Sequence, residues 1–472
     1  MPPLPRRSVL MMIPLLLAGC AIPPPPGKVP ALRAADTLAA ASLDGTNADG
    51  WPVESWWRDL GDAHLTALIE TAISDAPGLA EALARLRTAQ GYARSADAAV
   101  LPSAALGGSV GEQKQSYNLG IPPAFVPHGW NDTGGAQAQI AYDLDLFGRG
   151  HAALRAATSE AAATAIEARA ARLAIATSVA EAYADLGRMA ELRAIAQASL
   201  DVREQTAALV LRRVQIGLDT RAEARQAQAG ISAARASLAA AEQAVVLTRN
   251  RLAALLGAGP DRGAAITPPP PGQFRATALP PRLALDLVGR RADIAAARAR
   301  AEAALARVRG ARAAYFPDIN LLAFVGAQSL GLANLTAGGS RTGQASAAIS
   351  LPLFAGGRLA GDYGAARGGY DLAVAHYNAT LVQAVREVAD AAAAQTALAS
   401  ELIAAAEAVA RSEEAWDLTR RRYTGGLTPY LAVLSAQDAL LRNRQALADC
   451  QGRVLAVRVE LIRALGGGFT AG

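Results

Sequence analysis

Apolar residues return at every seventh position in two stretches of the chain, residues 213–257 and 422–466. The repeating apolar positions are Ile231, Leu238, Val245 and Leu252 in the first stretch, and Leu440, Leu447, Val454 and Leu461 in the second. A shift of 209 residues superimposes the two stretches and lays Gly217-Leu218 on Gly426-Leu427. Strict seven-residue spacing predicts helices that supercoil against neighbouring helices. The repetition predicts a duplicated unit, so the function must come from what two such units build.

Further helical segments surround both stretches in the same order. The predicted helices are 65–72, 79–99, 149–214, a return helix to 256, 293–314, a long helix ending at Tyr423 and its return helix. Pro102 and Pro317 end the equivalent shorter helices, because proline cannot continue a helix. Gly217 and Gly426 predict tight turns before the return helices. A helix over 149–214 would be roughly 90–100 Å long.

Two other segments alternate between apolar and polar residues with a period of two, which is typical of β-strands. These segments are 136–146 and 344–353, each preceded by a weaker strand candidate, at 103–114 and 319–328. Their length and their single apolar face match those of transmembrane β-strands. Asp143 and Asp145 share the polar face in this prediction. We interpret them as lining a wet lumen rather than as an acid–base pair.

Four strands of this length cannot close a barrel, because single-chain barrels begin at about eight strands. An open strand edge leaves backbone groups unsatisfied in hydrocarbon. The chain is therefore predicted to share one barrel among copies, with about eight strands in a dimer or twelve in a trimer. The long helices are too polar and alanine-rich to cross a membrane and are expected to project into an aqueous space. The predicted fold is mainly α with β, a duplicated α-β-β-α-α unit.

The N-terminal residues are typical of an export signal. Arg6-Arg7 precede an apolar run over residues 9–18, and the run ends in Leu17-Ala18-Gly19-Cys20. This tetrapeptide resembles the lipobox of bacterial lipoproteins, which implies lipid attachment at Cys20, and Ala21 implies the outer membrane. A plain secretory signal and a twin-arginine route are the alternatives. The proline-rich residues 22–30 are expected to form an extended tether.

The amino-acid composition argues against several classes of protein function. Hydrophobic residues make up 52% of the 472 residues but aromatic residues only 5%, which favours close packing of alanine-rich helices over a large aromatic core. The net charge is only +5, and no concentrated basic patch predicts nucleic-acid binding. Cys450 is interpreted as a lone helical cysteine. Without a phosphate loop, nucleophile elbow or zinc signature, we expect neither an enzyme nor a cofactor.

Several motifs together resemble the TolC-like outer-membrane efflux proteins, in particular the lipoprotein branch of NodT or OprM type. They are the duplicated order, the lipobox, Tyr142 to Gly148, Leu351 to Gly357, Arg422-Tyr423 and Gly426-Leu427. The resemblance implies a homotrimer with a twelve-stranded outer-membrane barrel and a periplasmic α-barrel. It also implies a periplasmic adaptor and an inner-membrane RND transporter as partners. Ala292 stands where this branch usually has proline.

The resemblance places the gate at the helix turns. The candidate gate residues are Glu223, Tyr423, Arg221 and Arg225, and the candidate adaptor contacts are Gly217, Leu218, Gly426 and Leu427. We expect Glu223 to accept a hydrogen bond from Tyr423 of an adjacent hairpin. The alternatives are a solvated charge for Glu223, packing for Tyr423, and packing of the turns for the leucines. Ala432 and Ser435 stand where family members can carry aspartates, which predicts a weaker or differently built gate.

The leading hypothesis is a passive export duct for drugs or other small molecules in the outer membrane. The alternatives are the exit duct of a type I protein-secretion system and a periplasmic coiled-coil scaffold without a pore. The expected segments are a signal peptide (1–19), a lipidated tether and equatorial segment (20–63), a first repeat (64–257, with a β-hairpin at 103–147), a linker (258–281), a second repeat (282–466, with a β-hairpin at 318–354) and a tail (467–472).

Overall fold

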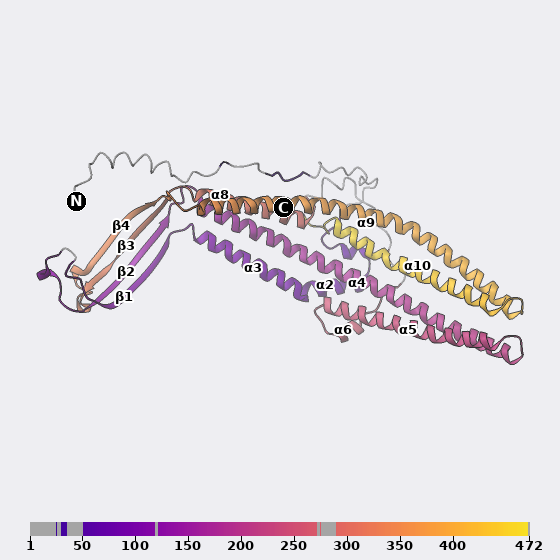
Figure 1. Ribbon diagram of the computed structural model, residues 1–472. Helices are drawn as coiled ribbons and strands as arrows, with labels where there is room; N and C mark the ends of the chain where they lie inside the picture. Colours follow the sequence, from indigo (N-terminus) through magenta and orange to yellow (C-terminus); the bar gives the residue numbers. More distant parts are fainter. Residues whose placement is uncertain are drawn as a thin grey trace. The chain divides into compact units, whose positions relative to one another are not determined.

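The computed structural model describes residues 25, 30–34, 51–118, 121–270, 274 and 289–470. The predicted signal peptide, Cys20, most of the tether and part of the 258–281 linker lie outside the described residues. The described elements are η3 (Trp56–Leu60), α2 (Ala63–Asp75), α3 (Pro77–Ala98), β1 (Ser103–Gln113), η4 (Pro123–Phe125), β2 (Asn131–Asp143), α4 (Arg149–Gln215), α5 (Arg221–Leu255), α6 (Pro260–Ala264), α8 (Ala292–Ala313), β3 (Asp318–Leu330), η5 (Leu332–Asn334), η6 (Gly338–Ser340), β4 (Arg341–Ser350), α9 (Arg358–Thr424) and α10 (Tyr430–Ala464) (Figure 1). The mainly helical fold with strands is confirmed, in the duplicated order.

The chain divides into two compact units that cut across both repeats. One unit contains Leu86–Thr164 and Ala297–Tyr377, and the other contains Arg33–Arg85, Ala165–Ala296 and Asn378–Gly472. Each repeat thus contributes one β-hairpin to the first unit and most of one helical hairpin to the second. The repeats are units of sequence, and the compact units are built from both of them.

The first unit contains a four-stranded antiparallel sheet in the order β1-β2-β3-β4 within the described residues. The register pairs Leu106 with Ala138, Ala138 with Val325, and Val325 with Gly343. Directly paired residues share a face, and successive residues alternate between faces. The sheet therefore has one face rich in Ala, Leu, Val and Ile, and a second face rich in Ser, Thr, Asn and Gln. The predicted alternation over 136–142 is confirmed.

The strand ends differ from the prediction. β2 spans Asn131–Asp143 rather than 136–146, and β4 spans Arg341–Ser350 rather than 344–353. After β2 the chain turns, because the Asp143 carboxylate accepts the backbone N–H of Asp145 at 2.8 Å and Asp145 has a φ of 42°. Leu146 consequently lies outside the sheet, and the apolar run continued the strand pattern past its actual end.

Asp145 was wrongly predicted to line a lumen beside Asp143. Its side chain is 6% exposed and accepts the backbone N–H groups of Gly150 and His151 at 2.9 and 2.8 Å. Its Oδ2 also lies 2.5 Å from the Nδ1 atom of His151. The carboxylate thus satisfies free N–H groups at the start of α4, where the helix dipole favours negative charge.

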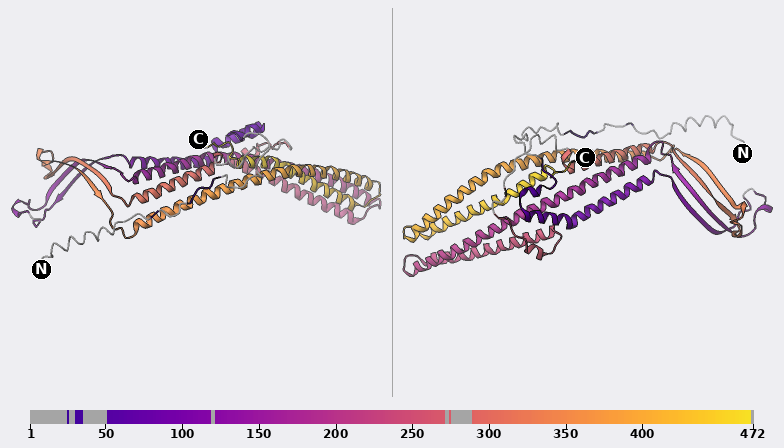
Figure 2. Two further views of the ribbon diagram at one scale, coloured as in Figure 1. Left: turned by 90° about the horizontal axis from the view of Figure 1, so that it is seen from above. Right: turned by 180° about the vertical axis from the view of Figure 1, so that it is seen from behind.

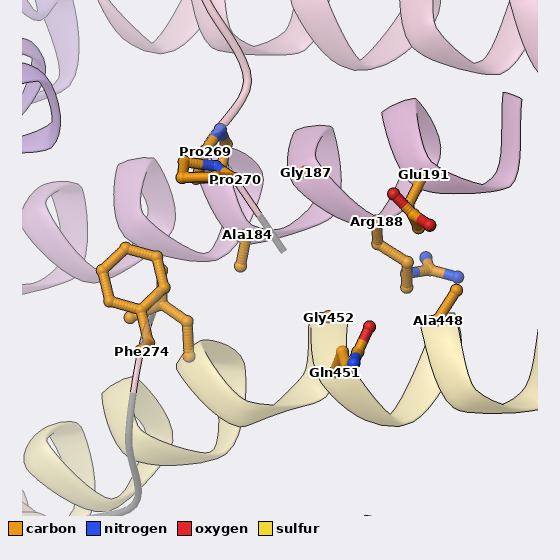
Figure 3. A pocket seen from close by; sticks show the side chains of 11 residues that line it. Ala184, Gly187, Arg188, Glu191, Pro269, Pro270, Phe274, Ala448, Gln451 and Gly452 are labelled. Atoms are coloured by element: carbon orange, nitrogen blue, oxygen red, sulfur yellow. The ribbon is translucent and has the colours of Figure 1, made fainter. Parts of the chain in front are cut away.

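The second unit is centred on a core where η3 and α2 pack on the middle of α4. Trp57, Leu65, Ile69, Tyr183 and Leu186 are buried together there. The residues after α6 also pack in this unit, where Pro269 lies against Gly187 of α4 (Figure 3). A Cβ at Gly187 would lie 2.7 Å from the Pro269 Cγ atom, so only glycine admits this close approach. The 258–281 segment was predicted to be irregular throughout, and the short helix α6 corrects that prediction.

The helical hairpins of the two repeats have equal lengths. α4 and α9 each have 67 residues, and α5 and α10 each have 35. The ends of the two hairpins lie side by side in the second unit (Figure 1, Figure 2). Among the described helices, none combines the length and the apolar character needed to cross a membrane.

Candidate functional site

The two helical hairpins turn with the same backbone geometry. Gly217 and Gly426 have φ values of 77° and 76°. In each turn the next leucine donates its backbone N–H to a carbonyl five residues earlier, at Arg213 (2.9 Å) and at Arg422 (2.8 Å). This pattern is the Schellman motif, which needs a left-handed residue and therefore favours glycine. The predicted turns at these two glycines are confirmed.

Three side chains from the two turns form one hydrogen-bonded cluster. The Tyr423 hydroxyl donates to Oδ2 of Asp219. Arg213 donates from Nε to the same carboxylate oxygen at 3.1 Å and from Nη1 to the backbone oxygen of Tyr423 at 3.1 Å. Its guanidinium carbon also lies 4.5 Å from the centre of the Tyr423 ring. We call Arg213, Asp219 and Tyr423 the tip triad; it joins α4 and the turn after it to the end of α9.

The side chains of the tip triad are largely shielded from solvent. Tyr423 is 0% exposed, and the side chains of Arg213 and Asp219 are 11% and 5% exposed. Buried charges are costly unless they are paired and hydrogen-bonded, so each member depends on the other two. The hydrogen bond to Asp219 raises the pKa of Arg213, and burial raises the pKa of Tyr423, with the Asp219 carboxylate adding to the effect. The phenol therefore remains a hydrogen-bond donor at any physiological pH.

Small apolar residues surround the triad and hold the hairpins together. The Tyr423 and Tyr430 rings lie 6.1 Å apart. The other buried members of this cluster are Ala207, Val210, Ala224, Ala227 and Val433, from α4, α5 and α10. Both sequence interpretations of Tyr423 are thus partly met, since it packs and also makes a polar link between hairpins.

Glu223 does not hold Tyr423 within this chain, so the predicted hydrogen bond is wrong there. The Glu223 carboxylate accepts the backbone N–H of Thr220 at 2.7 Å, and the Thr220 hydroxyl accepts the backbone N–H of Glu223 at 3.3 Å. This capping box fixes the first turn of α5. The sequence held the signal for it, because Thr220 precedes Glu223 by three residues. Asp219, the residue that binds Tyr423, was missed although it follows the turn directly.

The remaining candidates lie at the surface of the turns. Arg221 and Arg225 are exposed, and Arg225 donates to the Oε1 atom of Gln228 at 3.1 Å. Leu218 and Leu427 are 61% and 72% exposed. The turns therefore present apolar side chains to their surroundings, with the triad buried behind them. No group of three His, Cys, Asp or Glu residues is placed to hold a metal ion in the described part of the chain.

The sequence of the chain is similar to those of known outer-membrane proteins. Residues 68–258 and 283–467 match the sequence profile described as "Outer membrane efflux protein". The chain is 32% identical over 475 residues to "Outer membrane protein OprJ" of Pseudomonas aeruginosa, covering 98% of this chain and 96% of that protein. It is 30% identical over 472 residues to "Multidrug resistance outer membrane protein MdtP" of Escherichia coli K12, covering 97% and 95%.

A solved structure is similar in both sequence and fold. The crystal structure of the outer membrane protein VceC from Vibrio cholerae is 43% identical and superimposes with a TM-score of 0.84. The match covers 89% of this chain and 100% of that chain. The two matched segments of the family profile contain the two helical hairpins, whose turns carry the tip triad. The chain therefore belongs to the outer membrane efflux protein family, which confirms the resemblance seen in its sequence motifs.

Proposed function

We propose that the chain is the outer-membrane channel of a tripartite RND-type efflux system and a passive export duct for drugs or other small molecules. The observation that carries this proposal is the two-faced sheet. Leu106, Val110, Val325 and Ile349 on its apolar face are 68–84% exposed in the single chain. A hydrocarbon environment would bury these side chains, while the amide-rich and hydroxyl-rich face would line an aqueous lumen.

The strand edges support assembly of several copies. β1 and β4 form the two ends of the sheet order, so each has one strand neighbour in the described chain. Unpaired backbone groups in hydrocarbon cost several kcal/mol each. We propose that β1 of one copy pairs with β4 of the next in a homotrimer. Three copies would close a twelve-stranded barrel, with the helical hairpins forming a periplasmic α-barrel.

The tip triad supplies a closing contact for such a duct. It links the two hairpins of one protomer through buried charge-assisted hydrogen bonds. We propose that breaking this link accompanies opening, with the exposed Leu218 and Leu427 contacting hairpins of a periplasmic adaptor. Arg221, Arg225 and Glu223 would then border this contact. The inner-membrane RND transporter would supply the driving force, because the duct itself performs no covalent chemistry.

The N-terminal sequence supports a second attachment to the membrane. We propose that Cys20 carries the lipid and anchors the chain in outer-membrane lipid. A Cys20→Ala variant is expected to lose incorporation of labelled palmitate. Incorporation that is unchanged in this variant would contradict lipid attachment at Cys20.

Conductance and cross-linking test the proposed duct. In a Cys450→Ala background, chains with one cysteine in β1 and one in β4 are expected to form a disulfide-linked trimer in membranes. The same chains are expected to show single-channel conductance in planar bilayers when reduced. A monomer without conductance would contradict the duct and favour the pore-less scaffold. Restored drug resistance in an efflux-channel deletion strain, without restored secretion of a type I protein substrate, would separate the proposed system from the secretion alternative.

A further inference from the structure

The ends of the two helical hairpins, which lie side by side (Figure 1, Figure 2), carry the excess positive charge of the chain. Residues 211–226 and 420–435 are the equivalent segments around the two turns, and we call them the basic tips. Together they contain seven arginines and two carboxylates, a net charge of +5, which equals the formal net charge of all 472 residues. The rest of the chain is therefore neutral overall, and the fold gathers at one place arginines that are far apart in the sequence.

Both carboxylates of the basic tips are engaged, whereas most of the arginines are exposed. Asp219 is bonded to Arg213 and Tyr423 within the tip triad, and Glu223 accepts the backbone N–H of Thr220. The arginines that remain exposed around the turns are Arg212, Arg221, Arg225, Arg420, Arg421 and Arg422.

The described residues neutralise few of these exposed charges. Arg420 and Arg421 share a single carboxylate, that of Asp417, at 3.2 and 2.7 Å. The other four arginines form no ion pair within the described part of the chain. Arg225, one of these four, donates to the neutral Oε1 atom of Gln228 at 3.1 Å. Positive charge is thus left uncompensated at the turns.

Arginines farther along the same helices do have charge partners. Arg235 on α5 lies 2.8 Å from the Glu204 carboxylate, and Arg444 on α10 lies 2.6 Å from that of Glu413. These two ion pairs occupy equivalent positions in the two repeats, 209 residues apart. The uncompensated charge is therefore a property of the basic tips and not of the whole hairpins.

The stability of the helices accounts for only some of the exposed arginines. Arg212, Arg421 and Arg422 lie in the last turns of α4 and α9, where the helix dipole favours positive charge. Arg221 is the first residue of α5, where the same dipole disfavours positive charge. Local stability therefore does not account for Arg221.

We propose that the basic tips make the entrance of the duct selective for anions, so that small organic anions are its favoured cargo. This inference rests on the proposed function, in which the hairpins of three copies form a tube that ends at these turns. Charge of one sign around a pore raises the local concentration of ions of the opposite sign. Three copies would triple the charge of the basic tips around one entrance.

Reversal potentials in planar bilayers test the selectivity of the wild-type channel. Under a tenfold gradient of KCl, chloride is expected to permeate at least about twice as readily as potassium. Benzoate and benzylammonium are organic probes of similar size and opposite charge. Gradients of sodium benzoate and of benzylammonium chloride are expected to show that benzoate permeates more readily.

The failure of this inference can be told from the failure of the proposed function. Conducting channels in which the cations permeate as readily as the anions would overturn the inference alone, and would favour a contact between these arginines and an acidic partner protein. Absence of any conductance would contradict the duct itself, and the inference with it.

Charge variants at the basic tips test the role of the arginines. The triple variant Arg221→Gln, Arg225→Gln and Arg422→Gln removes three exposed charges from each copy, and the permeability ratio of chloride to potassium is expected to fall to about one. The matched variant Arg221→Lys, Arg225→Lys and Arg422→Lys retains the charge and should keep the wild-type ratio. An unchanged ratio in the glutamine variant, or the same loss in the lysine variant, would overturn the proposal.

A second control tests the position of the charges. Arg235→Gln combined with Arg444→Gln removes two positive charges roughly 27 Å along the helices from the turn glycines. This distance exceeds the Debye length of about 10 Å at 0.1 M salt, so the selectivity is expected to change little. A loss of selectivity as large as that of the glutamine variant at the tips would show that the tips are not the selective part of the duct.

Discussion

The protein has one turn between α4 and α5 and another between α9 and α10. The two turns have the same backbone conformation, but nearly all of their hydrogen-bonding side chains differ. Each has a left-handed glycine and the same pair of closing hydrogen bonds. The first turn continues into Asp219 and the Thr220 capping box, while the second continues into Thr428 and Pro429, which makes no side-chain cap. The two turns thus have the same backbone conformation, whereas the side chains of one turn complement those of the other.

The complementarity is specific to a few positions. Tyr423 stands where the first repeat has Val214, and Asp219 stands where the second has Thr428. One turn therefore supplies the carboxylate and the other the phenol, and neither could form the tip triad with an identical copy of itself. The difference between the turns is what links the two hairpins of the protomer.

The largest effect is expected from removing the carboxylate of the first turn. Asp219→Ala leaves Arg213 buried without its charge partner and the Tyr423 hydroxyl without an acceptor. Breaking such a largely buried pair costs about 3 kcal/mol, which corresponds to roughly a hundredfold shift toward separated tips. Planar-bilayer recordings should show a large increase in open probability.

The matched control for that substitution is Thr428→Ala at the equivalent position of the second turn. It should leave the open probability near that of the wild type, because Thr428 is outside the triad. Similar recordings from Asp219→Ala and Thr428→Ala would show that the difference between the turns has no role in closing.

A smaller effect is expected from removing the phenol hydroxyl alone. Tyr423→Phe retains the ring under Arg213 and the Arg213–Asp219 ion pair but loses one hydrogen bond to a charged acceptor. The expected loss is about 1.5–3 kcal/mol, measured as increased conductance or as a lower denaturant midpoint of the purified protein. Tyr430→Phe, in the same cluster, should change either measurement much less. An equal effect of both variants would assign the role of Tyr423 to packing.

The same hydroxyl predicts a pH dependence. Folding raises the pKa of Tyr423 above its usual value of ~10, because burial and the Asp219 carboxylate disfavour the phenolate. The folded state therefore holds this proton more tightly, so its stabilisation is complete below pH ~10 and is lost as pH rises toward the folded pKa. Wild-type stability should fall more steeply than that of Tyr423→Phe above pH ~10 in denaturant titrations. Parallel pH profiles would contradict the raised pKa.

The smallest effect is expected at the capping box. Glu223→Ala should cost about 0.5–1 kcal/mol locally, because it removes one of the two reciprocal capping bonds at the start of α5. Hydrogen exchange should quicken in the first turn of α5, while bilayer conductance stays unchanged. The second repeat already carries Ala432 at this position. Increased conductance of the Glu223→Ala variant would instead show that Glu223 takes part in the closing contact.

The sequence by itself determined the duplication, the helices, the strand hairpins and the glycine turns. These features depend on local rules: apolar period, proline stops and the left-handed conformation that glycine allows. Strand ends were less well determined, because Leu144 and Leu146 continue an apolar pattern past the point where Asp145 turns the chain. The apolar period does not show where a side chain forms a hydrogen bond with the backbone and so replaces the bond to the neighbouring strand.

Only the tertiary structure decided the partners of the polar residues. The spacing of Glu223 from the turn suggested that it binds Tyr423. In the structure the Glu223 carboxylate accepts the backbone N–H of Thr220 instead, and the Tyr423 hydroxyl donates to Asp219. Gln228 and Gln437 are equivalent in sequence, but one is exposed and bonded and the other is buried and unbonded among the described residues. Hydrogen bonds join atoms within about 3 Å, and such distances between separate helices follow from packing rather than from spacing along the chain.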